Sequence, residues 1–308
     1  MGYLRLSITD RCNLRCGYCI PKEGIVTQPH EAILSFEEIL RFLKIFADLG
    51  IKKIRLTGGE PLVRKGIVDL VKNISQIDGL EEICLTTNGI LLSSYVKDLK
   101  NAGLKSMNIS LDTLRQERFK SITGKDLLGQ VLDGINRARK LFNTVKLNVV
   151  VRKQVNDDEI VDFVNFAQEN NLILRFIEFM KVTPLWEESF FVPIEKVRNI
   201  CHSKFGLEWI GYRNLGPAEY YRYSDGIIGF IKTHSLNCRM CSRLRLTAIG
   251  ELKLCLYQPK GVSLRDFLRS GVEDSFIKAK IKNLMSTKDA IDYTSWEESG
   301  VYMSSVGG

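Results

Sequence analysis

The chain has 308 residues, of which 44% are hydrophobic and 26% are charged. These proportions are ordinary for a globular protein, and the length allows one large α/β domain with an appendage, or two domains. No apolar run is long enough to cross a bilayer, and strand-like sequence begins almost at the N-terminus, where a secretory signal would need an apolar segment. We therefore expect a cytoplasmic protein with no membrane partner.

The formal net charge of +8 and the pI near 9.0 raise the question of a polyanionic partner. Nucleic-acid-binding segments typically combine runs of Lys and Arg with aromatic residues, and the sequence has none. The basic residues are instead spread singly, many of them at the ends of predicted strands. This distribution favours a small phosphorylated ligand over nucleic acid, although a solvated basic surface also explains part of the excess.

Six apolar, β-rich runs alternate with helix-like runs along the first 180 residues. The predicted strands are Leu4–Ile8, Lys53–Thr57, Glu82–Thr87, Ser106–Leu111, Val145–Val151 and Leu172–Phe179. The predicted helices are a first one that begins at Ser35 and ends before Gly50, then Gly66–Ile77, Leu91–Ala102, Leu127–Leu141 and Asp157–Asn170. Ser35 and Glu38 have the spacing of a capping box. Six consecutive βα units predict parallel strands with right-handed crossovers, and hence an incompletely closed (β/α)6 barrel of TIM type.

The pattern weakens after residue 180. Residues Val197–Phe205 suggest a short helix, and Gly216–Arg222 suggests a connecting strap. We therefore predict a partial barrel over residues 3–222 and a C-terminal extension over residues 223–308.

Three cysteines follow the first predicted strand. Three residues separate Cys12 from Cys16, and two separate Cys16 from Cys19. A structural zinc site needs four protein ligands, and no fourth Cys or His follows nearby. Three close thiolates favour a cuboidal iron–sulfur cluster in which one iron is left without a protein ligand and can bind a small molecule.

Loops with polar residues and glycines follow the next strands. These are Gly58-Gly59-Glu60-Pro61 after the second strand, Thr86-Thr87-Asn88-Gly89 after the third, Ser110-Leu111-Asp112 after the fourth and Met180 after the sixth. In barrels of parallel strands the chemistry lies at the C-terminal ends of the strands. We expect these loops and the cysteines to open on one rim.

A second cysteine group lies near the C-terminus. Two residues separate Cys238 from Cys241, and thirteen separate Cys241 from Cys255. With His234 or His202 these thiolates could complete a zinc site, but a second cluster with an open iron is the favoured interpretation. Cys84 and Cys201 lie in strand-like and helix-like runs, which indicates buried small hydrophobic residues.

The Cys-x3-Cys-x2-Cys motif with Tyr18 before its last cysteine, together with the Gly-Gly-Glu-Pro motif, resembles the radical S-adenosylmethionine (SAM) superfamily. The resemblance implies a [4Fe-4S] cluster held by Cys12, Cys16 and Cys19, with SAM bound at the open iron. It also implies SAM contacts from four residues, namely Tyr18, Gly59, Ser110 and Met180. For Ser110 and Met180, ordinary packing at strand ends is the alternative.

Nearly the whole chain resembles the GTP 3′,8-cyclase family of molybdenum cofactor biosynthesis. The matching segments are LRLSITDRCNLRC, IRLTGGEPLVR, LTTNG, MNISLD, KLNVV, RFIEFM, GPAEYYR, the second cysteine group with RLRLT, and the terminal Gly-Gly. The resemblance implies a second [4Fe-4S] cluster held by Cys238, Cys241 and Cys255, with GTP between the two clusters. It implies GTP contacts from Arg5, Arg55, Thr86, Lys146, Arg243, Leu244 and Arg245.

The resemblance implies a reaction that proceeds through radical intermediates. A 5′-deoxyadenosyl radical would abstract H3′ of GTP, and C3′ would attack C8 of guanine to give (8S)-3′,8-cyclo-7,8-dihydroguanosine 5′-triphosphate. Arg243 and Arg245 would act in catalysis, with Gly307 and Gly308 entering the active site as a tail without side chains; a frayed terminus is the alternative. Lys53 and Arg175 are weaker candidates for phosphate contacts.

The resemblance also implies partners. These are a reductant protein, cyclic pyranopterin monophosphate synthase as the enzyme that takes the product, and a second copy of the chain in a homodimer. The rival interpretations are a peptide-modifying radical SAM maturase, which usually has a longer C-terminal cysteine array, and a non-catalytic zinc or iron–sulfur protein.

Overall fold

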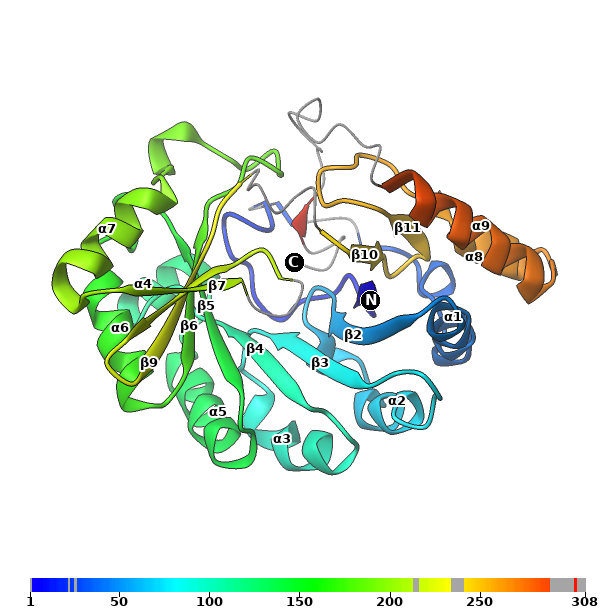
Figure 1. Ribbon diagram of the computed structural model, residues 1–308, viewed down its shortest axis with the longest axis horizontal. Helices are drawn as coiled ribbons and strands as arrows, with labels where there is room; N and C mark the ends of the chain where they lie inside the picture. Colours follow the sequence, from blue (N-terminus) through cyan, green and yellow to red (C-terminus); the bar gives the residue numbers. More distant parts are fainter. Residues whose placement is uncertain are drawn as a thin grey trace.

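The computed structural model describes residues 2–21, 23–24, 27–212, 216–233, 241–288 and 302–303. In this part of the chain twelve strands form one sheet, in the order β12-β11-β10-β1-β2-β3-β4-β5-β6-β9-β8-β7 (Figure 1). The six predicted strands are the parallel strands β1 (Gly2–Ser7), β2 (Ile51–Thr57), β3 (Glu82–Thr87), β4 (Ser106–Ser110), β5 (Val145–Val151) and β6 (Ile173–Glu178). The first and last strands of the order are not neighbours, so the predicted open barrel is confirmed.

The helices that connect these strands cover the outer face of the curved sheet (Figure 1). They are α1 (Phe36–Asp48), α2 (Ile67–Ile74), α3 (Leu92–Asn101), α4 (Gln116–Thr123), α5 (Leu128–Leu141), α6 (Ile160–Glu169) and α7 (Ile194–Phe205), with the 3-10 turns η1 (His30–Ala32), η2 (Pro61–Val63) and η3 (Glu188–Phe190). The capping box at the start of α1 is confirmed: Ser35 Oγ accepts from Glu38 N, and Ser35 N donates to Glu38 Oε2 over 2.8 Å. No helix in the described ranges is long and apolar enough to span a membrane.

Successive side chains of each strand point to opposite faces of the sheet. One face packs against the helices and forms the hydrophobic core, and the other is the inner face. On β1, Leu4 and Leu6 are fully buried and pack in the main hydrophobic core beneath the helices. Tyr3 and Arg5, one residue out of phase, line the cavity on the inner face. The strands therefore carry polar or charged residues on the inner face without breaking the core.

The parallel part of the sheet is longer than predicted. β9 (Gly226–Ile231) pairs in parallel with β6, and β10 (Arg243–Leu246) pairs in parallel with β1. The βα pattern of the sequence predicted neither strand; β9, for example, follows the strand Glu219–Tyr223 and not a helix. The strap predicted over Gly216–Arg222 is wrong in its second half, which forms strand β8 (Glu219–Tyr223).

Antiparallel strands complete both edges of the sheet. β7 (Glu208–Tyr212) pairs with β8, and β8 with β9; at the other edge β10 pairs with β11 (Glu251–Lys253), and β11 with β12 (Val262–Ser263). The chain then forms α8 (Leu264–Arg269) and α9 (Asp274–Thr287), which lie beside α1 (Figure 1). Because one sheet joins both parts of the chain, the division at residues 222 and 223 stays a prediction.

Candidate active site

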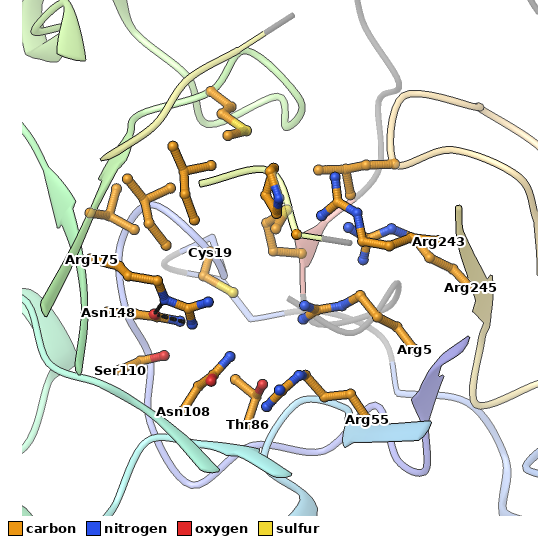
Figure 2. A pocket seen from close by; sticks show the side chains of 18 of the residues that line it. Arg5, Cys19, Arg55, Thr86, Asn108, Ser110, Asn148, Arg175, Arg243 and Arg245 are labelled. Atoms are coloured by element: carbon orange, nitrogen blue, oxygen red, sulfur yellow. Dashed lines mark hydrogen bonds between the residues drawn. The ribbon is translucent and has the colours of Figure 1, made fainter. Parts of the chain in front are cut away.

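A cavity of ≈ 340 Å³ lies on the inner face of the sheet, and its wall comes mainly from β1 to β6 and β10 (Figure 2). Most residues predicted for the site line it. They are Cys12, Cys16, Cys19, Tyr18, Gly59, Ser110, Met180, Arg5, Arg55, Thr86, Lys146, Cys241, Cys255, Arg243 and Arg245. The side chain of Leu244 instead packs in the hydrophobic core on the opposite face of β10. Cys238, His234, Gly307 and Gly308 lie outside the described residues.

The first cysteine loop is held by backbone hydrogen bonds. Cys19 N and Ile20 N both donate to the carbonyl of Cys16, at 2.9 and 3.0 Å, which turns the chain back on itself. The loop is attached to the end of α4, because Arg15 N donates to the carbonyl of Thr123 over 2.9 Å. This turn brings the three thiols of the loop to one side of the cavity.

The three thiols of the first cysteine loop are the residues that could hold a metal group at this end of the cavity. Burial raises the pKa of Cys16 well above its usual value, and the neighbouring Cys19, Asp112 and Cys12 act in the same direction. A bound cation would favour the thiolate form of Cys16. Within the described ranges, no three His, Cys, Asp or Glu side chains are grouped closely enough to hold one metal ion. Three thiolates can hold a four-iron cluster, each on a different iron.

The Gly-Gly-Glu-Pro loop packs directly against the start of the cysteine loop. Gly59 N donates to the carbonyl of Thr9 over 2.7 Å, and Glu60 N donates to the carbonyl of Arg11 over 2.8 Å. A Cβ atom on Gly59 would lie 2.3 Å from Arg11 O, so a side chain there would push the two loops apart. Gly59 thus allows the Gly-Gly-Glu-Pro loop to lie directly against the backbone of the cysteine loop.

Glu60 connects the loop after β2 with the loop after β3. Its carboxylate accepts hydrogen bonds from Leu62 N at 3.0 Å, Thr87 Oγ1 at 2.7 Å and Asn88 N at 2.7 Å. The side chain is only 1% exposed. Burial raises the pKa of Glu60 to about 7, although the three hydrogen bonds oppose this shift.

Tyr18 is oriented by the end of β4. Its hydroxyl donates to Asp112 Oδ2 over 2.6 Å, and Asp112 Oδ1 accepts from Val150 N over 2.8 Å. The guanidinium of Arg152 lies 4.8 Å from the centre of the Tyr18 ring. The ring therefore has a fixed position beside Cys16 and Cys19, between a carboxylate and a cation.

Eight basic residues line the cavity: Arg5, Lys53, Arg55, Lys146, Arg175, Lys232, Arg243 and Arg245. Burial lowers the pKa of Lys146 to about 7, and the charges of Arg175, Arg55 and Lys53 add to this effect. Burial likewise lowers the pKa of Arg5 to about 10 and that of Arg245 to about 9. The positive charges of neighbouring arginines, Arg243 among them, lower both pKa values further. Such a concentration of positive charge favours a ligand with several negative charges.

Some of these basic residues are fixed by protein partners. Arg55 Nε donates to Tyr3 Oη over 2.6 Å, and its Nη1 donates to the carbonyl of Leu85 over 2.8 Å. Arg175 Nε donates to Asn148 Oδ1 over 2.8 Å (Figure 2). Lys53 is paired with Glu82 at 2.6 Å, so its charge is partly balanced already.

The second cysteine group reaches the same cavity through Cys241 and Cys255. Arg243 Nε donates to Cys241 Sγ over 3.2 Å. Burial alone would raise the pKa of Cys241, but the charges of Arg243 and Lys288 outweigh it, and the pKa lies below its usual value. This cysteine is therefore prepared to act as a thiolate ligand.

The structure also brings residues to the cavity that the sequence interpretation did not select. Asn108 lies on β4 between Thr86 of β3 and Lys146 of β5, and Figure 2 shows it beside Thr86 and Ser110. It is 4% exposed, and its Oδ1 has no hydrogen-bond partner among the described residues. The sequence does hold an indication of this position: Asn108 lies two residues before Ser110 on one strand, so both side chains point to the same face of the sheet.

Comparison with known proteins defines the class. Residues 6–167 match the family model described as "Radical SAM superfamily", and residues 172–293 match "Molybdenum Cofactor Synthesis C". The chain belongs to the radical SAM superfamily, which implies a [4Fe-4S] cluster and SAM as cofactors. Streptococcus suis SuiB bound to S-adenosylmethionine shares this fold, with a TM-score of 0.61 and 16% identity over 92% of this chain and 64% of that chain.

Curated relatives narrow the class to one family. A protein of Thermodesulfovibrio yellowstonii named GTP 3′,8-cyclase is 46% identical over 91% of this chain and 89% of its own length. Proteins of the same name from Petrotoga mobilis and Alkaliphilus metalliredigens are each 43% identical, over 91% and 100% of this chain and 90% and 98% of their own lengths. The chain belongs to the GTP 3′,8-cyclase family.

Proposed function

We propose that this chain is a radical SAM enzyme that cyclises GTP to (8S)-3′,8-cyclo-7,8-dihydroguanosine 5′-triphosphate in molybdenum cofactor biosynthesis. The observation that carries the proposal is one cavity lined by cysteines of both groups and by eight basic residues. Thiolates that can hold a cluster and cations that can hold a triphosphate thereby face the same space.

Cys12, Cys16 and Cys19 would hold the first [4Fe-4S] cluster, which together with SAM supplies a 5′-deoxyadenosyl radical. Tyr18, Gly59, Ser110 and Met180 would contact SAM. The Tyr18 hydroxyl already donates a hydrogen bond to Asp112, and Arg152 lies over the ring, so a SAM contact would come from the remaining surface of the ring. Loops from successive strand ends would exclude water from the reacting atoms.

Arg5, Arg55 and Lys146 would hold the triphosphate, with Thr86 at the ribose. Thr86 Oγ1 and Asn108 Oδ1 are both buried without hydrogen-bond partners among the described residues, so a ligand hydroxyl there would satisfy them. Arg243, Leu244 and Arg245 would position the guanine side of GTP, with Leu244 contributing through its backbone. The reaction removes H3′ from the ribose and joins C3′ to C8 of the base.

Cys238, Cys241 and Cys255 would hold a second [4Fe-4S] cluster beside the base, and Gly307 and Gly308 would enter the cavity from the C-terminus. A reductant protein, a homodimer, a cytoplasmic location and transfer of the product to cyclic pyranopterin monophosphate synthase complete the proposal. These parts rest on the family resemblance of the sequence.

The test is anaerobic turnover. The protein is reconstituted with iron and sulfide and supplied with SAM, GTP and a strong reductant. We expect 5′-deoxyadenosine and a cyclised GTP product in equal amounts. Cys16→Ser should abolish both products, and Cys201→Ala, a buried cysteine of α7 outside the cavity, should not. Absence of both products from the unmodified protein would refute the function.

A further inference from the structure

Lys288, at the end of α9, reaches into the sheet rather than the solvent. The residue is 7% exposed. Its Nζ donates to the carbonyl of Leu254 over 2.6 Å and also to the carbonyl of Arg243. Lys278 and Lys280 of α9 are half-buried, and Lys282 is exposed. A buried ammonium is costly unless it is hydrogen-bonded or paired, and these two carbonyls are hydrogen-bond acceptors that offset the cost for Lys288.

The two carbonyls belong to the two segments that carry the second cysteine group. Arg243 lies two residues after Cys241, and Leu254 directly precedes Cys255. The antiparallel pairing of β10 and β11 includes Arg245 with Lys253 and Leu246 with Leu252. Continuing that register would set Arg243 opposite Cys255, but the described β11 ends at Lys253. Lys288 connects the two segments where the backbone pairing stops.

The charge of Lys288 also acts on the thiols. It lowers the pKa of Cys241, after the larger effects of burial and of Arg243. Burial lowers the pKa of Lys288 itself, and the charges of Cys241 and Cys255 oppose that shift. The ammonium is thus close enough to interact with both cysteines. Three thiolates give a cuboidal cluster a net negative charge, which a nearby buried cation offsets.

We propose that Lys288 is a positioning residue for the second cluster: it fixes the spacing of the Cys241 and Cys255 segments and balances the charge of the cluster. The inference rests on the proposed function, because it requires that the second cysteine group binds iron and sulfide. It adds a residue from outside the cysteine segments, on a helix that follows them in the chain.

The test isolates the second cluster in the full-length chain. Cys12, Cys16 and Cys19 are replaced by Ser, so that only the second group can bind a cluster after reconstitution. Iron that survives a chelator challenge is then measured in this parent, in Lys288→Met, in Lys288→Arg and in the exposed control Lys282→Met. We expect Lys288→Met to retain about tenfold less iron, as is typical when a partner of a metal ligand is lost.

Lys288→Arg should rescue most of the iron, because it keeps the charge and the donors. Lys288→Gln, which keeps a donor but no charge, should shift the reduction potential of the remaining cluster to a more negative value. Equal iron and equal potentials in parent, Lys288→Met and Lys288→Gln would overturn the inference. A parent without any cluster would refute the second cluster itself, and the inference with it.

Folding is checked in the protein with all its cysteines. There, Lys288→Met should still cleave SAM reductively to 5′-deoxyadenosine at the first cluster, with an unchanged circular dichroism spectrum. Loss of SAM cleavage or of folded structure would also overturn the inference, since Lys288 would then support the whole fold and not the second cysteine group.

Discussion

Arg5 on β1 lies directly opposite Arg245 on β10, and both side chains enter the same cavity (Figure 2). On the other side of β1, Arg5 is opposite Arg55 of β2. Three arginines thus form a row across three adjacent parallel strands. Like charges in this arrangement repel one another, so the row is tolerable mainly as a binding surface for an anion.

Arg245→Ala should weaken GTP binding and leave the iron content unchanged. A hydrogen bond to a charged group contributes about 1.5–3 kcal/mol, so we expect KM for GTP to rise about tenfold to a hundredfold. Steady-state kinetics and iron analysis measure the two effects. Arg139→Ala, on the exposed side of α5, is the control. Loss of iron with an unchanged KM would make Arg245 a support of the second cysteine group instead.

Lys146 should make GTP binding depend on pH. Burial and the charges of Arg175, Arg55 and Lys53 lower its pKa to about 7, so the amine is largely neutral above pH 7. A bound triphosphate favours the charged amine, so binding takes up a proton and affinity should fall as pH rises from 7 to 9, by up to about tenfold per unit.

Equilibrium dialysis of GTP across this pH range tests the idea. Lys146→Met should bind GTP more weakly at pH 7 and should lose most of the pH dependence, whereas the exposed Lys140→Met should behave like the unmodified protein. An identical pH profile in Lys146→Met and unmodified protein would assign the proton uptake to another group.

Tyr18→Phe should weaken SAM binding. The substitution removes the 2.6 Å hydrogen bond that orients the ring and leaves Asp112 with one partner fewer in a buried position. Loss of a partner by a buried group costs about 1–3 kcal/mol of folding stability. A ring that is no longer held must also be ordered when SAM binds, at a cost of about 1 kcal/mol, so the Kd for SAM should rise about fivefold. Binding of SAM to the reconstituted protein is the measurement, with Tyr95→Phe on α3 as control. Unchanged affinity would show that the ring is held by packing alone.

Local patterns in the sequence predicted much of the fold and the site. Each of the strands β1 to β6 is an apolar run of its own, and the Cys12–Cys19 loop and the Gly58–Pro61 loop are short motifs, so each could be recognised without knowledge of the rest. The position of these loops on one rim could also be predicted, because the C-terminal ends of parallel strands lie at the same edge of the sheet.

Features that depend on distant parts of the chain could not be predicted in this way. The pairing of β10 with β1 joins residues 243–246 to residues 3–6, and nothing in either segment specifies the other. The contacts of Lys288 depend on where α9 packs, since its amphipathic pattern gives no reason to single out one of several lysines. Asn108 was passed over because an Asn within a strand has no distinctive motif, and its missing partner is visible only in three dimensions.

Glu60 should make the free energy of unfolding fall with rising pH. Its pKa is raised by burial from 4.5 in the unfolded chain to about 7 in the folded protein. Below pH 4.5 the carboxyl is protonated in both states; between pH 4.5 and 7 the unfolded chain releases the proton more readily, which favours unfolding. The stability is therefore highest at the acidic end of this window and is lost as pH rises through 7, by about 3 kcal/mol in total.

Denaturant unfolding of the metal-free protein at pH values from 4.5 to 8 measures this dependence. Glu60→Gln cannot titrate, so the difference in unfolding free energy between it and the unmodified protein should change across the window, while Glu81→Gln, at an exposed carboxylate, should give a constant difference. A constant difference for Glu60→Gln would mean that the hydrogen bonds from Leu62, Thr87 and Asn88 keep the carboxylate ionised despite its burial. In that case Glu60 would hold the two loops together as a permanent anion.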